Sequence, residues 1–234
     1  MKKILSILTS LAFCLTLAFN PSYSFAKKKE LPDITHDGLE RVSKPKSGAD
    51  VVYLQPGADL SGYNKIILLE PNIAFRKGWK NRQNAQRQLT RRISDRDMEK
   101  MIDRGKDLFM DEFTDELENK GYPVVHTKGE DVMIVRAAII DLNVAYADPN
   151  NLGGMWNKVY TEGAGEATLV IELFDSITGQ ILVRGVDRKW DSGGGYSWRI
   201  PRSQSTNIRD ARRALRSWAK MLAIGLDHAK EEAK

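Results

Sequence analysis

The sequence predicts an α+β fold with two layers: a mostly antiparallel sheet of about four to five strands, and two helices on one of its faces. Three observations lead to this prediction. Residues 95–120 and 207–229 carry apolar side chains at helical spacing. Shorter apolar stretches, rich in β-branched residues, stand before and between these two segments. The resulting order of strand, helix, strands and helix is typical of two-layer α+β domains.

The first strand is expected at Lys65 to Glu70, a continuous apolar run that Pro71 ends. A helix is expected from about Asp95 to Lys120, because Ser94 and Asp97 have the spacing of a capping box. Its buried stripe is predicted to consist of Met98, Met101, Ile102, Leu108, Phe109, Phe113 and Leu117.

Three further strands are predicted, at 132–146, 167–174 and 181–190. The first of them is apolar on both alternating sets near Ile134 to Ile140, so it should be central in the sheet. The last alternates more clearly between apolar and polar residues, so it should lie nearer an edge. Between the last two strands, Asp175 to Gln180 predicts a tight hairpin with a bulge, in which Gly179 adopts a positive φ.

The last helix is predicted to start with Asn207 as its N-cap, with Asp210 three residues later, and to end near Ala229. One arc of this helix is apolar and comprises Ile208, Ala211, Leu215, Trp218, Leu222 and Leu226. A separate arc is basic and comprises Arg209, Arg212, Arg213, Arg216 and Lys220. We therefore expect one face to dock on the sheet and the other to be a basic surface.

Residues 1–26 are expected to be a cleaved secretory signal peptide, because two lysines precede an apolar stretch and small residues precede a cut between Ala26 and Lys27. The apolar stretch, Ile4 to Phe19, is shorter than the roughly 20 residues that a bilayer span needs. Cys14 is the only cysteine, and Phe13 stands where lipoprotein processing needs a small residue. We therefore expect the mature protein in the periplasm, where it can associate with the envelope. We expect no lipid to be attached to Cys14.

The mature chain is predicted to contain an irregular lead-in at 27–63 and one α+β domain at 64–231. The whole chain has 36 basic and 31 acidic residues, and two of the lysines leave with the signal, so the mature charge is small. This balance does not favour a nucleic-acid partner. No cysteine remains to form a disulfide, and no other stretch is apolar enough to span a membrane.

Several stretches together carry a resemblance to a known family: His36-Asp37-Gly38-Leu39, Tyr53 to Tyr63 with its Pro-Gly-Ala-Asp-Leu piece, Leu69-Glu70-Pro71, and Asp175-Ser176-Ile177-Thr178-Gly179. Over roughly residues 36 to 190 the chain resembles the bacterial envelope proteins of domain-of-unknown-function family 3313. The resemblance implies an envelope protein and, for many members, a lipoprotein. It implies no reaction and no catalytic residues, and the missing small residue before Cys14 departs from the lipoprotein pattern.

Residues 76–92 contain seven basic residues and no acidic one: Arg76, Lys77, Lys80, Arg82, Arg87, Arg91 and Arg92. As a functional site, this segment would be an anion-binding strip for lipid phosphates, with Trp79 entering the interface. The alternative is a solvated loop that leans on the acidic side of the first helix. The sequence favours that alternative, with partners among Asp103, Asp107, Asp111, Asp115 and Glu116.

Candidate aromatic contacts are Trp79, Trp156, Tyr196 and Trp198, of which the last three lie near glycine-rich stretches. Such side chains can stack on a sugar or a peptide, although large aromatics more often pack in a core. No metal site is expected, because His36, His126 and His228 stand far apart without a second ligand at metal spacing. No cofactor motif is present either.

The sequence shows no Gly-x-Ser-x-Gly elbow, and the mature chain has no thiol nucleophile. Glu166, Glu172 and Asp175 lie around one hairpin and leave a carboxylate pair open, although strand alternation explains them as exposed positions.

The sequence therefore favours an exported periplasmic or envelope-associated module without catalytic activity, which acts as a binding or structural protein toward an unknown ligand. Its partner would be another envelope protein or an anionic envelope surface. One alternative is a peripheral binder of anionic envelope lipid or polysaccharide through residues 76–92, and another is an uncharacterised hydrolase.

Overall fold

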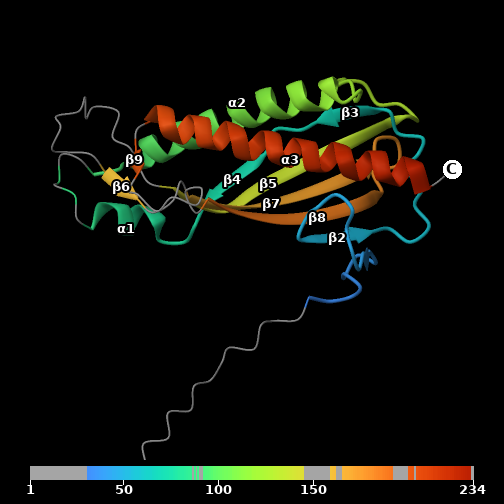
Figure 1. The fold of residues 1–234 in the computed structure, drawn as a ribbon, viewed down its shortest axis with the longest axis horizontal. Helices are drawn as coiled ribbons and strands as arrows, with labels where there is room; N and C mark the ends of the chain where they lie inside the picture. Colours follow the sequence, from blue (N-terminus) through green and yellow to red (C-terminus); the bar gives the residue numbers. More distant parts are fainter. Residues whose placement is uncertain are drawn as a thin grey trace, which may run out of the picture. The chain divides into compact units, whose positions relative to one another are not determined.

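The structure of the chain, a computed structural model, describes residues 31–85, 87, 89, 92–144, 159–161, 165–191, 200–202 and 204–232. The chain divides into Met1–Leu31 and Pro32–Lys234, and the helices and strands of the described residues belong to the second unit. In this unit two long helices, α2 (Asp95–Asn119) and α3 (Gln204–Glu232), lie side by side on one face of a sheet (Figure 1). The predicted α+β class with two layers is confirmed.

The main sheet contains seven strands in the order β1-β2-β8-β7-β5-β3, with β4 also pairing with β5. Its strands are β1 (Glu40–Arg41), β2 (Val51–Leu54), β3 (Lys65–Leu68), β4 (Asn72–Phe75), β5 (Val132–Val144), β7 (Gly165–Asp175) and β8 (Ile181–Asp191). Both β3 and β4 run parallel to β5, whereas the other pairings are antiparallel. The predicted mostly antiparallel sheet of about four to five strands is thus corrected to a mixed sheet of seven, in which most pairings are antiparallel. A separate pair consists of β6 (Val159–Thr161) and β9 (Ile200–Arg202).

The parallel part of the sheet explains the role of Pro71. It ends the predicted first strand, because it cannot donate a backbone hydrogen bond. Beyond it the chain returns to the same neighbour, and β4 pairs with β5 through Asn72 opposite Ala138 and Ile73 opposite Ile139. The 13 residues of β5 are long enough to accept β3 and β4 one after the other, which confirms that this strand is central.

The lead-in is more regular than predicted. Its apolar piece forms β2, which pairs with β8 through Val51 opposite Val186 and Leu54 opposite Val183. The prediction that β8 lies near an edge is therefore wrong over this part of the strand. Four residues between turn-forming neighbours give too short a pattern to be distinguished from a loop.

The hairpin and the first long helix follow the predicted local chemistry. The turn between β7 and β8 closes through Asp175, whose amide donates to the carbonyl of Gln180 at 2.9 Å, and Gly179 has φ +71°. In α2, Ser94 and Asp97 form the complete capping box. Of the predicted stripe, Leu108, Phe109, Phe113 and Leu117 are buried.

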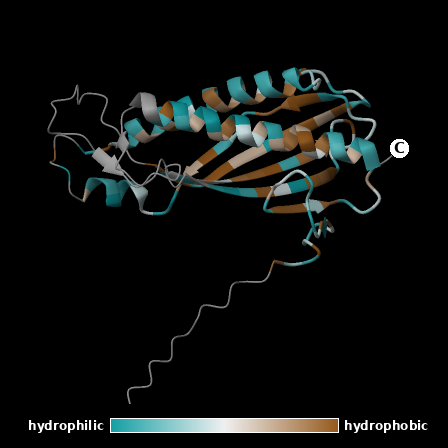
Figure 2. Cartoon of the chain, in the orientation of Figure 1, coloured by the Kyte–Doolittle hydropathy of each residue, from teal (hydrophilic) through white to brown (hydrophobic). Residues whose placement is uncertain are grey.

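The last helix starts earlier than predicted, because α3 begins at Gln204 and Asn207 lies inside it rather than at its N-cap. Its apolar arc docks on the sheet as expected, with Leu215, Trp218 and Leu226 buried in the core. Figure 2 shows mostly apolar strands and two long helices along which polar and apolar turns alternate. A third, short helix, α1 (Trp79–Asn84), was not predicted. Within the described residues, no helix combines the length and apolar character that a bilayer crossing requires.

Candidate functional site

The open face of the sheet, on the side opposite α2 and α3, is the first candidate surface. Side chains alternate between the two faces of a strand. In β5, Met133 and Val135 are buried in the core below the helices. Their neighbours Ile134 and Arg136 therefore lie on the open face, and so does Ile140, which keeps 37 % of its surface exposed.

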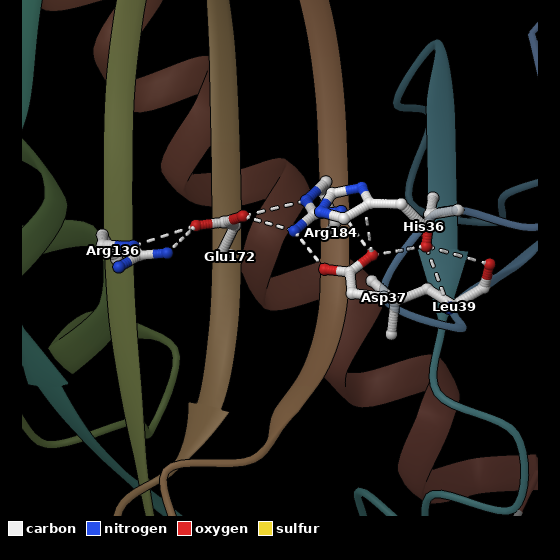
Figure 3. Close-up of polar contacts among 7 residues, drawn as sticks. His36, Asp37, Leu39, Arg136, Glu172 and Arg184 are labelled. Carbon is white, nitrogen blue, oxygen red and sulfur yellow. Dashed lines mark hydrogen bonds and ion pairs between the residues drawn. The ribbon is translucent and has the colours of Figure 1, made fainter.

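A row of four charged side chains crosses this open face (Figure 3). Register places Arg136 of β5 opposite Glu172 of β7, and Glu172 opposite Arg184 of β8. Arg136 donates to one carboxylate oxygen of Glu172 at 2.6 Å and 2.9 Å, and Arg184 donates to the other at 2.8 Å. Arg184 also donates two hydrogen bonds, of 2.6 Å and 3.0 Å, to the carboxylate of Asp37 in the loop before β1. The row thus ties four segments together.

The electrostatics of the row keep both carboxylates ionised. Hydrogen bonds from Arg184, followed by one from Thr35, hold the pKa of Asp37 far below its ordinary value. Burial raises the pKa of Glu172, but hydrogen bonds from Arg136 and Arg184 outweigh burial and lower it overall. The row is therefore a compensated set of two cations and two anions, and it offers no group with a pKa near neutrality for proton transfer.

Half-exposed apolar side chains surround the charged row. The strand registers place Ala138 opposite Val170 and Val170 opposite Val186 on this face, and Phe174 lies under the guanidinium of Arg136, 4.7 Å from the ring centre. The apolar members of the open face are Ile134, Ala138, Ile140, Val170, Phe174 and Val186. Together they form an apolar surface with a charged centre.

The basic segment at 76–92 is largely engaged with the protein itself. Arg76 pairs with Glu166, whose side chain is only 1 % exposed and which also pairs with Arg188. Lys80 contacts Asp95, the first residue of α2, at 2.6 Å. Both counterions differ from the acidic residues of α2 that the sequence suggested as partners.

Other cations of the segment bind backbone groups near them. Arg82 donates to the carbonyl of Lys77 at 2.8 Å, and Arg87 donates to that of Gln83 at 2.9 Å. The side chains of Lys77 and Arg92 are exposed. These contacts fit a solvated loop that is paired with the rest of the protein better than they fit a free anion-binding strip.

Trp79 does not lie on the surface. It is 1 % exposed, its indole N–H donates to the carbonyl of Val144 at 2.9 Å, and its ring stacks on Phe75 with 4.4 Å between centres. The side chain of Asn84 also anchors the segment, because it forms two hydrogen bonds with the backbone of Ile93, at 2.8 Å and 3.0 Å. Trp79 is therefore a packing residue rather than a contact for a partner.

Some of the predicted site residues fall outside the described part of the chain, namely Ala26, Lys27, Arg91, Trp156, Tyr196 and Trp198.

The sequence did not identify the buried Glu112 of α2 as a key residue. It is 1 % exposed and forms ion pairs with Arg212 and Arg216 of α3. Burial raises the pKa of Glu112, but hydrogen bonds from the two arginines lower it below its ordinary value. The signal was present, because Glu112 stands beside Phe113 inside the apolar stripe of the helix.

The three carboxylates considered for catalysis do not converge. Glu172 belongs to the charged row, whereas Asp175 accepts hydrogen bonds from the turn and from the hydroxyl of Tyr63. Glu166 and Asp175 stand at opposite ends of β7, roughly 30 Å apart at the usual rise of a strand. Among the described residues, no group of three or more His, Cys, Asp or Glu side chains is arranged to hold a metal ion.

Comparisons with known proteins bear on the family but not on the ligand. The family model described as Protein of unknown function (DUF3313) matches residues 30–222. No curated protein matches the chain at a significant level.

Among solved structures, the PelC dodecamer from Paraburkholderia phytofirmans is 11 % identical, with 71 % of this chain and 96 % of that chain covered and a TM-score of 0.34. A protein from Caulobacter crescentus CB15 described as a lipoprotein is 14 % identical, with 75 % and 93 % covered and a TM-score of 0.32. A homologue of a neuraminyllactose-binding hemagglutinin from Helicobacter pylori is 13 % identical, with 74 % and 90 % covered and a TM-score of 0.29. Likenesses of this size support no shared function.

Proposed function

Because the chain belongs to the DUF3313 family, whose members are described as proteins of unknown function, we propose a function from its own surfaces: it is an exported, envelope-associated module that binds another protein through the open face of its sheet and catalyses no reaction. The observation that carries this proposal is the apolar surface around the charged row of Asp37, Arg184, Glu172 and Arg136.

The composition of this face suits a protein partner. Soluble proteins rarely leave large contiguous apolar surfaces exposed, and such surfaces mark interaction sites. Here three neighbouring strands contribute aliphatic side chains and Phe174 to one face. Because the charged groups already pair with one another, a partner can cover them at a smaller desolvation cost than isolated charges would impose.

The absence of a catalytic role is supported by how the acidic groups are used. Glu112 and Glu166 are each held by two arginines, and the carboxylate of Asp187 accepts a hydrogen bond from the indole of Trp218 at 2.8 Å. Carboxylates with these partners act as structural ties between elements. A general acid or base needs a pKa near the working pH and access to a substrate.

Two isoleucines of similar exposure make a matched test of the open face. Ile140 lies on the open face and is 37 % exposed, whereas Ile224 lies on α3 and is 41 % exposed. With a photoreactive amino acid placed at each position in turn, we expect a discrete protein adduct in the periplasm from position 140 only. Excess unlabelled wild-type protein should compete with it.

A second pair of variants connects this crosslink to binding. Added in excess as an unlabelled competitor, Ile140→Asp should fail to displace the partner crosslinked from position 140, while Ile224→Asp should displace it as the wild type does. Both variants should unfold at the wild-type urea midpoint, since each site is partly exposed. Equal adducts from both positions, or none from position 140, would reject the open face as the binding surface.

The alternative of anionic envelope binding through residues 76–92 receives less support, because Arg76 and Lys80 already have acidic partners and Trp79 is buried. The hydrolase alternative lacks a convergent group of acidic side chains within the described residues.

A further inference from the structure

An apolar cavity of about 410 Å³ lies between the sheet and the second half of α3. Its floor is the helix-facing side of β2, β7 and β8, where Leu54, Ile171 and Val183 line it, and its wall on α3 includes Leu222 and Leu226. The loop at residues 42–49 closes it from the side. Its volume lies within the roughly 300–1,000 Å³ range of small-molecule sites.

Two of the residues that line the cavity, Gly185 and Gly225, have no side chain to fill it. Gly185 of β8 stands opposite Ile171 and opposite Val52, at a position where other core strand residues carry aliphatic side chains. A Cβ at Gly185 would lie 3.1 Å from Ile171 Cγ2. On the helix, Gly225 lets Ser47 of the loop approach so closely that a Cβ there would lie 3.1 Å from Ser47 Cβ.

A shallow basic groove of about 880 Å³ runs along the outer side of α3. Its cations are Lys189 of β8 and Arg209, Arg212, Arg213, Arg216 and Lys220 of α3, and no acidic residue lines it. Two of these cations also have acidic partners beside the groove, since Arg213 pairs with Asp210 at 3.0 Å and Lys189 with Asp187 at 3.3 Å. The buried Glu112 holds Arg212 and Arg216 from below, while their side chains remain 41 % and 57 % exposed. Fixed guanidinium groups with unused N–H donors favour phosphate oxygens.

The two hollows meet, because Ser47 and Met221 line both of them. From this juxtaposition we propose that the protein binds a single anionic phospholipid, with one acyl chain in the apolar cavity and the phosphate on the basic groove of α3. A groove of cations beside an apolar cavity is complementary to a molecule with an anionic head and an apolar tail. Neither a free phosphate nor a neutral chain would use both hollows.

Dodecyl phosphate is the probe that tests this proposal. It is titrated into the wild-type mature protein with no other detergent present. Titration calorimetry with octyl, decyl and dodecyl phosphate below their critical micelle concentrations should show affinity rising about fourfold per methylene group, the increment for burying an acyl chain. Inorganic phosphate and dodecyl maltoside, which each lack one half of the ligand, should bind far more weakly.

Two sets of variants separate the halves of the site. Gly185→Val and, as a second route, Ala58→Phe place bulk in the cavity and should abolish the dependence on chain length. The double variant Arg209→Gln/Arg213→Gln should keep that dependence but weaken binding about thirtyfold, from roughly fivefold per cation near an anionic group. Met101→Phe fills the cavity under the first half of α3, which also meets the basic groove, because Lys189, Arg209 and Arg213 line both. It should leave the dependence on chain length unchanged, and a loss of that dependence in Met101→Phe alone would place the acyl chain there instead.

All variants are first checked for a wild-type circular dichroism spectrum and a cooperative unfolding transition. Each binding result then supports or overturns one part of the proposed site. Affinity that is independent of chain length in the wild type would overturn the role of the cavity. Equal affinity for dodecyl maltoside would overturn the role of the groove. Unchanged binding in both Gly185→Val and Ala58→Phe, or no binding of dodecyl phosphate at all, would overturn the whole site. The open face of the sheet takes no part in these measurements, so its proposed function stands or fails separately.

Discussion

Two regions of the chain are rich in basic residues, and the structure treats them differently. In residues 76–92 the charges are dense in sequence, but Arg76 reaches the buried Glu166 and Lys80 reaches Asp95, while Trp79 buries its ring. In α3 the basic residues are spread over three turns, yet they gather along one side of the helix and line a continuous groove. Density in sequence and density in space are therefore different properties.

The difference shows where counterions come from. In the basic segment, Arg76 pairs with Glu166 of β7 and Lys80 pairs with Asp95 at the start of α2, while Arg82 and Arg87 bind backbone carbonyls. In α3, one buried carboxylate serves two arginines, so Glu112 positions more positive charge than it cancels. A cationic surface capable of binding thus arises where a buried acid fixes an excess of cations, and the number of cations in a segment does not reveal it.

The largest expected effect comes from the aromatic anchor of the basic segment. Trp79→Ala should lower the free energy of unfolding by about 3–5 kcal/mol, because it removes a fully buried ring and its hydrogen bond to Val144. Urea unfolding followed by circular dichroism measures this loss. A loss below about 1 kcal/mol would mean that the segment is not docked, and its cations would again be candidates for a free surface.

The second effect concerns the acid that organises the groove. Arg212→Gln/Arg216→Gln leaves the buried carboxylate of Glu112 without its counterions and should cost about 3 kcal/mol or more. Asp95→Ala removes the exposed partner of Lys80. Because this ion pair lies at the surface, its loss should cost less than about 1 kcal/mol. If the two costs measured by urea unfolding were equal, the distinction between the two regions would be wrong.

The sequence allowed the fold to be predicted where the signal is local. The capping box of Ser94 and Asp97 and the turn at Gly179 both depend on residues a few positions apart, and both are confirmed. The strands β1, β2 and β4 were missed, whereas β3, which also has four residues, was predicted because it lies in a continuous apolar run that ends at a proline. Their identity depends on which distant strand supplies hydrogen bonds, and no short pattern encodes that choice.

The candidate sites were harder to predict because they combine distant segments. Arg184 and Asp37 are 147 positions apart, yet they form the end of the charged row. Likewise, the buried Glu112 meets arginines about 100 positions later in the chain. The helical wheel gave the basic arc of α3 correctly, since its period is local, but it could not show that an acid of α2 lies beneath that arc.

A third charged region, the row on the open face, gives an intermediate effect that depends on pH. The folded-state pKa values of Asp37 and Glu172 lie below their ordinary values of 3.8 and 4.5, so ionised carboxylates stabilise the folded state above these values. That contribution is lost as the pH falls below about 4.5 and through the folded-state values. Urea midpoints measured from pH 6 down to pH 2 should fall, and Arg184→Gln should flatten the decline, because it removes the cation shared by both carboxylates.

The matched control for this pH dependence is Arg209→Gln, which lies on α3 and leaves the row intact. Its urea midpoints should decline with pH as those of the wild type do. A decline in Arg184→Gln as steep as in the wild type would show that other carboxylates dominate the acid sensitivity.

The smallest expected effect is the one that separates the two basic regions most directly. Lys77 is exposed, and Arg82 reaches only a backbone carbonyl of its own segment. If residues 76–92 are a docked connection, Lys77→Gln/Arg82→Gln should change the binding of mature protein to anionic vesicles by less than about twofold, although each basic residue close to such a surface contributes about 1 kcal/mol.

Arg209→Gln/Arg213→Gln makes the comparison quantitative in the same vesicle assay, because it removes the same number of charges from α3. We expect this variant to bind anionic vesicles much more weakly than the wild type at low salt, and the remaining binding to respond less to added salt. Neutral vesicles control for contacts that do not depend on charge. Stronger loss in the Lys77 and Arg82 variant than in the α3 variant would reverse the assignment, because it would show that the exposed cations of the segment reach the surface while Arg209 and Arg213 of the groove do not.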